Sequence, residues 1–252
     1  MVLDAASETE IATISVPGAF SIDDTPDHKT LYVGTLIGDV YTIDPVAMTV
    51  AQRYIGSHIG PSGYLAVSAL VLADGRLALL GSNNGFPVDG SQNYAIWNPV
   101  DNSFALGGCN SFIGNIGGFS RTVDRTKIIL ASVDGGQLCE VDESTGQAST
   151  FGPGGFPEVN FRTTPDGKYI IVPNNTDTLP PNQYANVYDA TTLNLVTQFP
   201  ISGDTSTAAG LAVSADSKTL FTPTDTIIYA YSLPSGQGAR AFTVSKQAVF
   251  WC

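Results

Sequence analysis

Asparagine, aspartate and tyrosine gather in two long polar segments of the chain, GSNNGFPVDGSQNY (81–94) and PNNTDTLPPNQYAN (173–186). Amide, carboxylate and phenol groups on loops suit a carbohydrate, a peptide or a hard cation such as Ca²⁺, which takes oxygen ligands. The candidate ligand-binding residues are Asn83, Asn84, Asp89, Tyr94, Asn174, Asn175, Asp177, Tyr184 and Asp204, with His58 nearby. The alternative interpretation is that these residue types simply build loops.

Catalytic and metal-binding motifs are missing from the sequence. The chain has two histidines, His28 and His58, and both lie in stretches that are typical of turns or connections. It contains no H-E-x-x-H, C-x-x-C, P-loop, G-x-G-x-x-G or G-x-S-x-G motif. We therefore predict no catalytic residue, no metal site and no cofactor, and Ca²⁺ is the one ion that the loop oxygens could hold.

The composition disfavours several classes of partner. Acidic residues outnumber basic ones by 23 to 11, so the formal charge is −12, which opposes binding to nucleic acid or to anionic membranes. The most apolar stretch, residues 64–80, is interrupted by Asp74 and Arg76 and is too short to cross a bilayer. The first residues, MVLDAASETE, lack the apolar segment of a signal peptide.

A repeated unit positions the polar loops. Its marker is the aspartate of a short turn, which recurs as Asp27, Asp74, Asp124, Asp166 and Asp216 at intervals of 47, 50, 42 and 50 residues. Short apolar runs flank each turn, and a third run follows in each copy as VYTID, YAIWN, LCEVD, ANVYD and IYAYS. Four short strands in about 45 residues, without helical periodicity, are typical of a propeller blade.

The predicted fold is therefore an all-β propeller of four-stranded antiparallel blades in one domain, residues 1–252. The expected blades span about 19–55, 64–107, 117–151, 158–201 and 209–244. Residues 2–18 (VLDAASETEIATISVPG) match 187–203 (VYDATTLNLVTQFPISG), so residues 2–16 are expected to form the outer strands of an incomplete blade. Either five blades close directly or the chain is part of a six- or seven-bladed ring. We favour the second, in which unpaired edges can associate.

The first turn of each blade carries a conformational prediction. In Thr164-Pro165-Asp166-Gly167 the glycine suits a left-handed backbone that closes the hairpin. The equivalent positions are His28, Gly75, Arg125, Gly167 and Ser217. We expect a positive φ at all of them, at about 1 kcal/mol for each residue that is not glycine.

The stretches TPDGKYIIVPN and ANVYDATTLNLVTQFPI resemble the YVTN-type β-propeller repeat of the lactonase-like propeller group. TLYVGT (30–35) is close to the tetrapeptide that names the repeat, whereas ALLGS and TLFTPT depart from it. The resemblance covers almost the whole chain and implies a propeller from a lineage of mostly exported bacterial proteins. A lactonase-like activity would need a carboxylate-held metal or an acid–base pair at the mouth of the central channel.

Polar residues also begin the innermost strands, which would line that channel. They are Asp23, Asp24, Ser120, Arg121, Asn160 and Arg162. Arginine beside aspartate in a narrow channel could bind an anionic ligand, or it could form structural ion pairs that satisfy buried polar groups. The sequence leaves both interpretations standing.

The cysteines indicate a disulfide. Cys109 lies in the connection before the third blade, and Cys139 lies early in the third strand of that blade, which starts from the same side. We expect these residues to be bonded, which would point to an oxidising compartment; the alternative is two free thiols. Cys252 is left over at the end of the chain.

We therefore expect a non-catalytic propeller in the periplasm, in secreted form or on the cell surface, which presents a loop-rich face to a protein, peptide or carbohydrate. The first alternative is a lactonase-like hydrolase, and the second is a purely structural domain of a larger surface protein. No nucleic-acid partner and no membrane insertion are expected.

Overall fold

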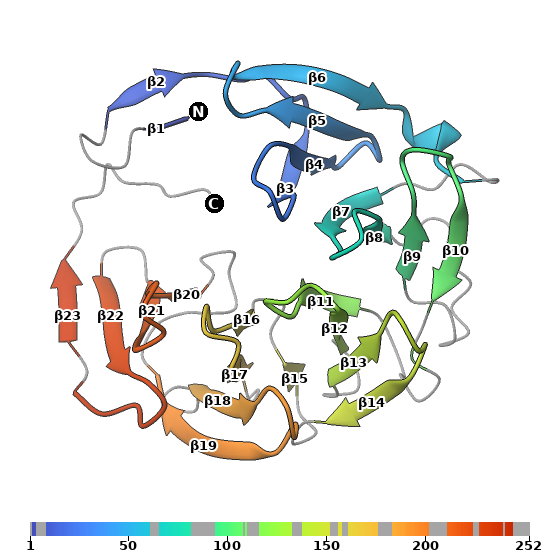
Figure 1. Cartoon of the computed structure of the whole chain (residues 1–252). Coiled ribbons are helices and arrows are strands. Elements are labelled where there is room, and N and C mark those ends of the chain that lie inside the picture. The colour runs from blue at the N-terminus through green and yellow to red at the C-terminus, as the bar shows by residue number, and fades with distance from the viewer. Residues whose placement is uncertain are drawn as a thin grey trace. The chain divides into compact units, whose positions relative to one another are not determined.

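The computed structural model describes residues 2–3, 9–60, 66–81, 94–107, 109, 116–132, 138–151, 156–157, 161–175, 183–201, 211–223, 227–238 and 240–243. Apart from one short 3-10 turn, η1 (Gly56–His58), its regular structure consists of β-strands (Figure 1). The chain divides into two compact units, Met1–Gly108 and Cys109–Cys252. Among the described residues, no helix is long and apolar enough to span a bilayer.

The first unit contains two four-stranded antiparallel sheets whose strands pair in chain order. Blade 1 consists of β3 (Ala19–Asp24), β4 (Leu31–Thr35), β5 (Val40–Asp44) and β6 (Thr49–Tyr54). Blade 2 consists of β7 (Ala66–Val71), β8 (Leu77–Gly81), β9 (Tyr94–Trp97) and β10 (Phe104–Gly107). Two further strands, β1 (Val2–Leu3) and β2 (Glu10–Ala12), pair with each other.

The second unit contains three more antiparallel sheets, two of four strands and one of five, because the inner strand of blade 4 is divided into two short pieces. Blade 3 consists of β11 (Ile116–Arg121), β12 (Lys127–Ser132), β13 (Leu138–Asp142) and β14 (Ala148–Phe151). In blade 4, β15 (Phe156–Pro157) and β16 (Arg162–Thr163) both pair with β17 (Tyr169–Asn175), followed by β18 (Gln183–Asp189) and β19 (Leu195–Pro200). Blade 5 consists of β20 (Ala212–Val213), β21 (Thr219–Pro223), β22 (Ile227–Ser232) and β23 (Arg240–Thr243). The all-β propeller fold with five four-stranded blades is confirmed.

The turn between the first and second strands of each blade has the expected backbone. The φ angles at His28, Gly75, Arg125, Gly167 and Ser217 are 57°, 85°, 61°, 71° and 62°. All of these values lie in the left-handed region, where a side chain is unfavourable by about 1–2 kcal/mol. The prediction of positive φ is confirmed at all of these positions.

Adjacent blades within a unit pack through apolar faces. Val40 of blade 1 joins Leu77, Leu79 and Trp97 of blade 2 in one buried cluster. Blade 3 packs on blade 4 through a cluster that includes Ile129, Leu138, Ile170 and Val172, and blades 4 and 5 share another, which includes Val187 and Leu220. Burying each of these side chains contributes about 1.5–3 kcal/mol, so the packing of neighbouring blades stabilises the repeat.

One face of blade 1 is covered only in part: Val33 and Tyr41 are buried beneath Ile14 and Val16, whereas the inner strand on that face is exposed. Along β3, Ser21 and Asp23 bond to backbone N–H groups of β7, whereas Phe20 and Ile22 alternate with them and are each 60% exposed. Two residues at the position equivalent to Ile22, Phe161 and Leu211, are 1% and 4% exposed. The inner strand of blade 1 therefore exposes apolar side chains at a position that blades 4 and 5 bury.

Candidate functional site

The blades have two ends, and the longest connections of the chain lie at one of them. At the turn end, short turns join the first strand to the second and the third to the fourth. At the loop end, the second strand is joined to the third and the blade continues to the next. The turn-end connections include 72–76, 122–126, 164–168 and 214–218, whereas loop-end connections include 55–65, 82–93, 108–115, 176–182 and 201–211. Longer connections at one end leave more chain for binding there.

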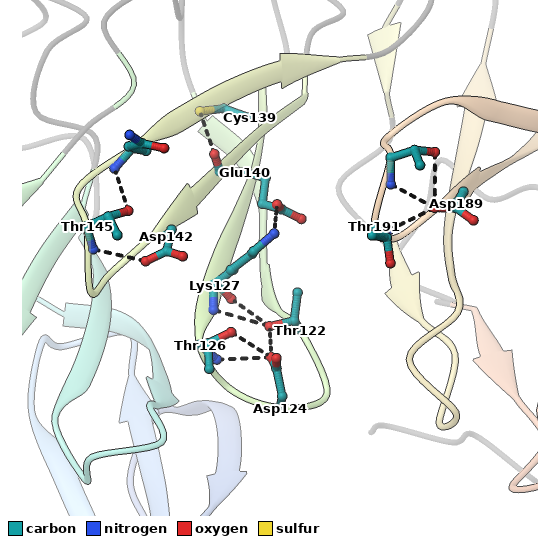
Figure 2. A network of polar contacts seen from close by, with 12 residues as sticks. Thr122, Asp124, Thr126, Lys127, Cys139, Glu140, Asp142, Thr145, Asp189 and Thr191 are labelled. Atoms are coloured by element: carbon teal, nitrogen blue, oxygen red, sulfur yellow. Dashed lines mark hydrogen bonds and ion pairs between the residues drawn. The ribbon is translucent and has the colours of Figure 1, made fainter.

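Carboxylates at the turn end are engaged by their own turns. The Thr164 hydroxyl donates to Asp166 Oδ1 at 2.7 Å, and the backbone N–H of Tyr169 donates to Thr164 Oγ1 at 3.0 Å. The same arrangement recurs at Thr25, Thr122 and Ser214 with the aspartate two residues on; Figure 2 shows the copy around Asp124. Side-chain oxygens thus close the hairpins, as in Asx-turns and their serine and threonine counterparts.

These hydrogen bonds stabilise the ionised form of the turn carboxylates. The Thr164 hydroxyl and the backbone N–H and side chain of Lys168 lower the pKa of Asp166 to about 2. In the blade 3 turn, the Ser144 hydroxyl and the Thr145 N–H likewise lower the pKa of Asp142 to about 2. A carboxylate held this way stays charged at neutral pH and is unsuited to proton transfer.

The loop end of blade 4 brings several predicted residues together. Asn174 of β17 is the cross-strand partner of Tyr184 of β18, and Asn175 pairs with Gln183. On the other side of β17, Asn174 pairs with Pro157 of β15, so its backbone lies between two strands. Tyr184 is half-buried. A paired strand end is a rigid base from which polar side chains can contact a ligand.

Other predicted ligand-binding residues have different positions. Tyr94 begins β9 and is 2% exposed, and a Cβ on Gly107 opposite it would lie only 2.5 Å from its ring, so Tyr94 belongs to the packing of blade 2. His58 is exposed and ends η1. The residues that lie outside the described ranges are Asn83, Asn84, Asp89, Asp177 and Asp204, and from the channel set Asn160.

The described channel residues bond to nearby strands and turns. Asp23 Oδ2 accepts from the backbone N–H of Val71 in the next blade at 2.7 Å, and Asp24 pairs with His28 in the adjoining turn. Arg162 Nη1 donates to the Phe161 carbonyl at 2.9 Å. The backbone carbonyl of Arg121 accepts from the Thr163 hydroxyl at 3.2 Å. These contacts favour the structural interpretation of Asp23 over the ligand-binding one.

His58 lies at a small hollow between blades 1 and 2. Nothing in the sequence indicates this hollow, although His58 itself is a candidate residue. The volume of the hollow is about 250 Å³, and it is lined by Arg53, Tyr54, Ile55, His58, Ile59, Trp97, Pro99 and Asn102. The Tyr54 ring meets Trp97 edge-on at 4.9 Å, and burial raises the pKa of Tyr54. Trp97 Nε1 donates to Asn102 Oδ1 at 2.8 Å. A hollow below the usual 300–1,000 Å³ of ligand pockets accepts only a small group.

A buried carboxylate braces the wall of this hollow. Asp39, whose side chain is 6% exposed, accepts from Arg53 Nη2 at 2.6 Å and from the Gly56 N–H at 2.8 Å. The hydrogen bond to Asp39 raises the pKa of Arg53, which also lies over the Tyr41 ring. A Cβ on Gly56 would lie 2.4 Å from the Gly38 carbonyl oxygen, so only glycine fits there. In the sequence, the one signal for this arrangement is the glycine before Asp39, Gly38. In the structure, Gly38 has a left-handed backbone.

The cysteine prediction is confirmed. Cys109 and Cys139 form a disulfide inside the second unit, with their Cα atoms 6.5 Å apart. Both are buried, at 1% and 0% exposure. Within the ranges given above, no three His, Cys, Asp or Glu side chains are grouped to hold a metal ion. Binding of Ca²⁺ to the loop carboxylates stays a prediction, since several of them lie outside those ranges.

Comparison with known proteins gives a likeness in structure but none in sequence. No protein-family model matches the chain, and no curated protein sequence matches it. Chains of solved structures that match number 1490. Among them is a chain of the Kuenenia stuttgartiensis hydrazine synthase, 15% identical, with a TM-score of 0.65 over 94% of this chain and 68% of that chain. At this identity the likeness concerns the fold alone.

Proposed function

We propose that the protein is a non-catalytic binding or scaffold propeller that contacts a protein, peptide or carbohydrate through the loop ends of its blades. The observation that carries this proposal is the contrast within blade 4. At its turn end, Asp166 is held by its own turn. At its loop end, Asn174 and Tyr184 stand as a cross-strand pair beside the connection 176–182.

We further propose that the chain belongs to the YVTN-type propeller group and works outside the cytoplasm. The Cys109–Cys139 disulfide supports this location, because disulfides persist in oxidising compartments. The exposed Phe20 and Ile22 support association through the inner strand of blade 1, β3.

Two tyrosines of blade 4 make a matched test. Tyr184 is the second residue of β18, at the loop end, Tyr169 begins β17 at the turn end, and both are half-buried. The full chain is applied to glycan and peptide arrays, and each hit is titrated with Tyr184→Ala and Tyr169→Ala. We expect Tyr184→Ala to weaken binding at least tenfold and Tyr169→Ala to change it less than twofold.

The alternatives are distinguished by the same samples. Hydrolysis of a lactone that ceases on addition of EDTA would overturn the non-catalytic assignment in favour of the hydrolase. If no array probe binds and no lactone is hydrolysed, the purely structural domain replaces the proposal. Equal loss of binding in both tyrosine variants would contradict the assignment to the loop end.

A further inference from the structure

The interface between blades 3 and 4 contains a polar group within an apolar cluster. Ile129 of blade 3 packs against Ile170 and Val172 of blade 4. Cross-strand partners share a face of a sheet, and Glu140 is the partner of Ile129. Glu140 therefore faces blade 4.

Two polar side chains of blade 4 face back toward blade 3. Asn186 is the partner of Val172, and Tyr188 is the partner of Ile170. Tyr188 also contacts Phe151 of blade 3, with ring centroids 5.3 Å apart. Asn186 and Tyr188 thus lie on the face that packs against blade 3.

Glu140, Asn186 and Tyr188 are buried at 5%, 1% and 2% exposure. Part of their hydrogen-bonding capacity is used: Lys127 Nζ lies 2.5 Å from Glu140 Oε1 (Figure 2), and Gln198 Nε2 donates to Asn186 Oδ1 at 2.9 Å. Glu140 Oε2, Asn186 Nδ2 and the Tyr188 hydroxyl make no hydrogen bond to any described protein group. Buried polar atoms of this kind need a partner, because an unsatisfied one is unfavourable by about 1–3 kcal/mol.

The repeat places the three residues at similar heights along their strands. Asp142 and Asp189 close equivalent turns, each accepting from the backbone N–H groups two and three residues on. Glu140 lies two residues before Asp142, whereas Tyr188 and Asn186 lie one and three residues before Asp189. Along the strand direction, Glu140 therefore lies between the levels of Tyr188 and Asn186. Because a strand rises about 3.3 Å per residue, Glu140 is offset from each of them by only about one residue step.

We propose that blades 3 and 4 bind an internal water molecule at this point, bridging Glu140 Oε2, Asn186 Nδ2 and the Tyr188 hydroxyl. Water can donate to the carboxylate, accept from the amide and bond to the phenol, and three such bonds are the usual number for a buried water. A metal cation fits poorly, because Asn186 presents its NH₂ group while Oδ1 accepts from Gln198. The bridge goes beyond the proposed binding function and does not depend on it.

Two of the equivalent positions in other blades are apolar. Going by the turn markers, Val187 of blade 4 stands where blade 3 has Glu140, and Ala95 of blade 2 stands where blade 4 has Asn186. Both are apolar. A polar bridge between blades 3 and 4 that blades 4 and 5 lack favours the correct succession of these blades, since a mispaired neighbour would leave Glu140 unsatisfied.

A crystal structure of the full chain near 1.5 Å tests the proposal directly. We expect density for a water within about 2.7–3.2 Å of Glu140 Oε2, Asn186 Nδ2 and the Tyr188 hydroxyl. A direct bond from Glu140 Oε2 to Asn186 or Tyr188, or a metal ion in this place, would overturn it. So would an interface without density between these atoms.

Urea unfolding of Tyr188→Phe gives a second test, because this variant removes the hydroxyl and little else. A bridged hydroxyl predicts a rise in the unfolding equilibrium constant of threefold or more, whereas an unbonded one predicts a fall. Tyr231→Phe, the equivalent position in blade 5, is the matched control. Combined with Glu140→Gln, Tyr188→Phe should act non-additively and Tyr231→Phe additively; additivity in both pairs contradicts the bridge.

Discussion

Reduction of the Cys109–Cys139 disulfide should destabilise the protein by an amount that the structure allows us to estimate. The bond joins residues 30 apart in sequence. Closing a loop of that length lowers the entropy of the unfolded chain, which in the chain-entropy model corresponds to about 3.6 kcal/mol at 25 °C. Both cysteines are buried, so a strong reductant reaches the bond chiefly when the protein opens. For a chain of this size, we expect Tm to fall by roughly 7 to 14 °C.

The assay is urea unfolding of a Cys252→Ser background, with and without a phosphine reductant, followed by tryptophan fluorescence. Using this background prevents exchange with the third thiol of the chain. A variant that also carries Cys109→Ser and Cys139→Ser should unfold near the reduced form and should not respond to the reductant. If the free energies of unfolding of the oxidised and reduced forms agree within about 1 kcal/mol, the estimate is refuted. If the reductant changes the unfolding of the triple variant, the reductant acts on something other than the disulfide.

Three further predictions concern single residues, each measured by urea or thermal unfolding. Gly75→Ala should destabilise by about 1 kcal/mol, because φ is 85° while a Cβ would meet no atom within 4 Å; Gly75→Asn should be milder, and equal effects would contradict the assignment to φ. The pKa of Asp166 is lowered to about 2, so its carboxylate contributes fully to the stability of the fold above the unfolded pKa near 3.8, and this contribution is lost as pH falls toward 2. Asp166→Asn should therefore lower Tm more at pH 6 than at pH 2.5. An equal fall in Tm at both pH values would refute this. Asp39→Ala should destabilise by about 2 kcal/mol, because Arg53 and the Gly56 N–H lose a buried acceptor, and a loss below about 0.5 kcal/mol would contradict that role.

The features that could be predicted from the sequence are those that recur within it. The spacing of the turn aspartates reveals the blades, and within each unit neighbouring copies bury their apolar runs against each other. The left-handed backbone at His28 and Ser217 follows from their alignment with Gly167, although neither is glycine. The disulfide follows from the topology of a blade, which brings the connection before blade 3 and the start of its third strand to the same end.

Features that depend on a single pair of neighbouring elements could not be predicted. Arg53 of β6 pairs with Asp39, the residue just before β5, and the sequence of no other blade repeats this pair. Tyr94 stands in a polar stretch of sequence, yet it is buried because Gly107 opposite it leaves room for the ring. Glu140 and Asn186 are 46 positions apart in different blades, and only the packing of their sheets places them face to face.

Hydrogen–deuterium exchange of the full chain, with and without a ligand identified on the arrays, tests the central claim of loop-end binding most directly. We predict slower exchange on binding in the peptides that cover 173–186, where Asn174 pairs with Tyr184. We predict no change in the turn at 164–168, where Asp166 is already engaged. Protection at that turn, or protection nowhere near 173–186, would contradict the claim.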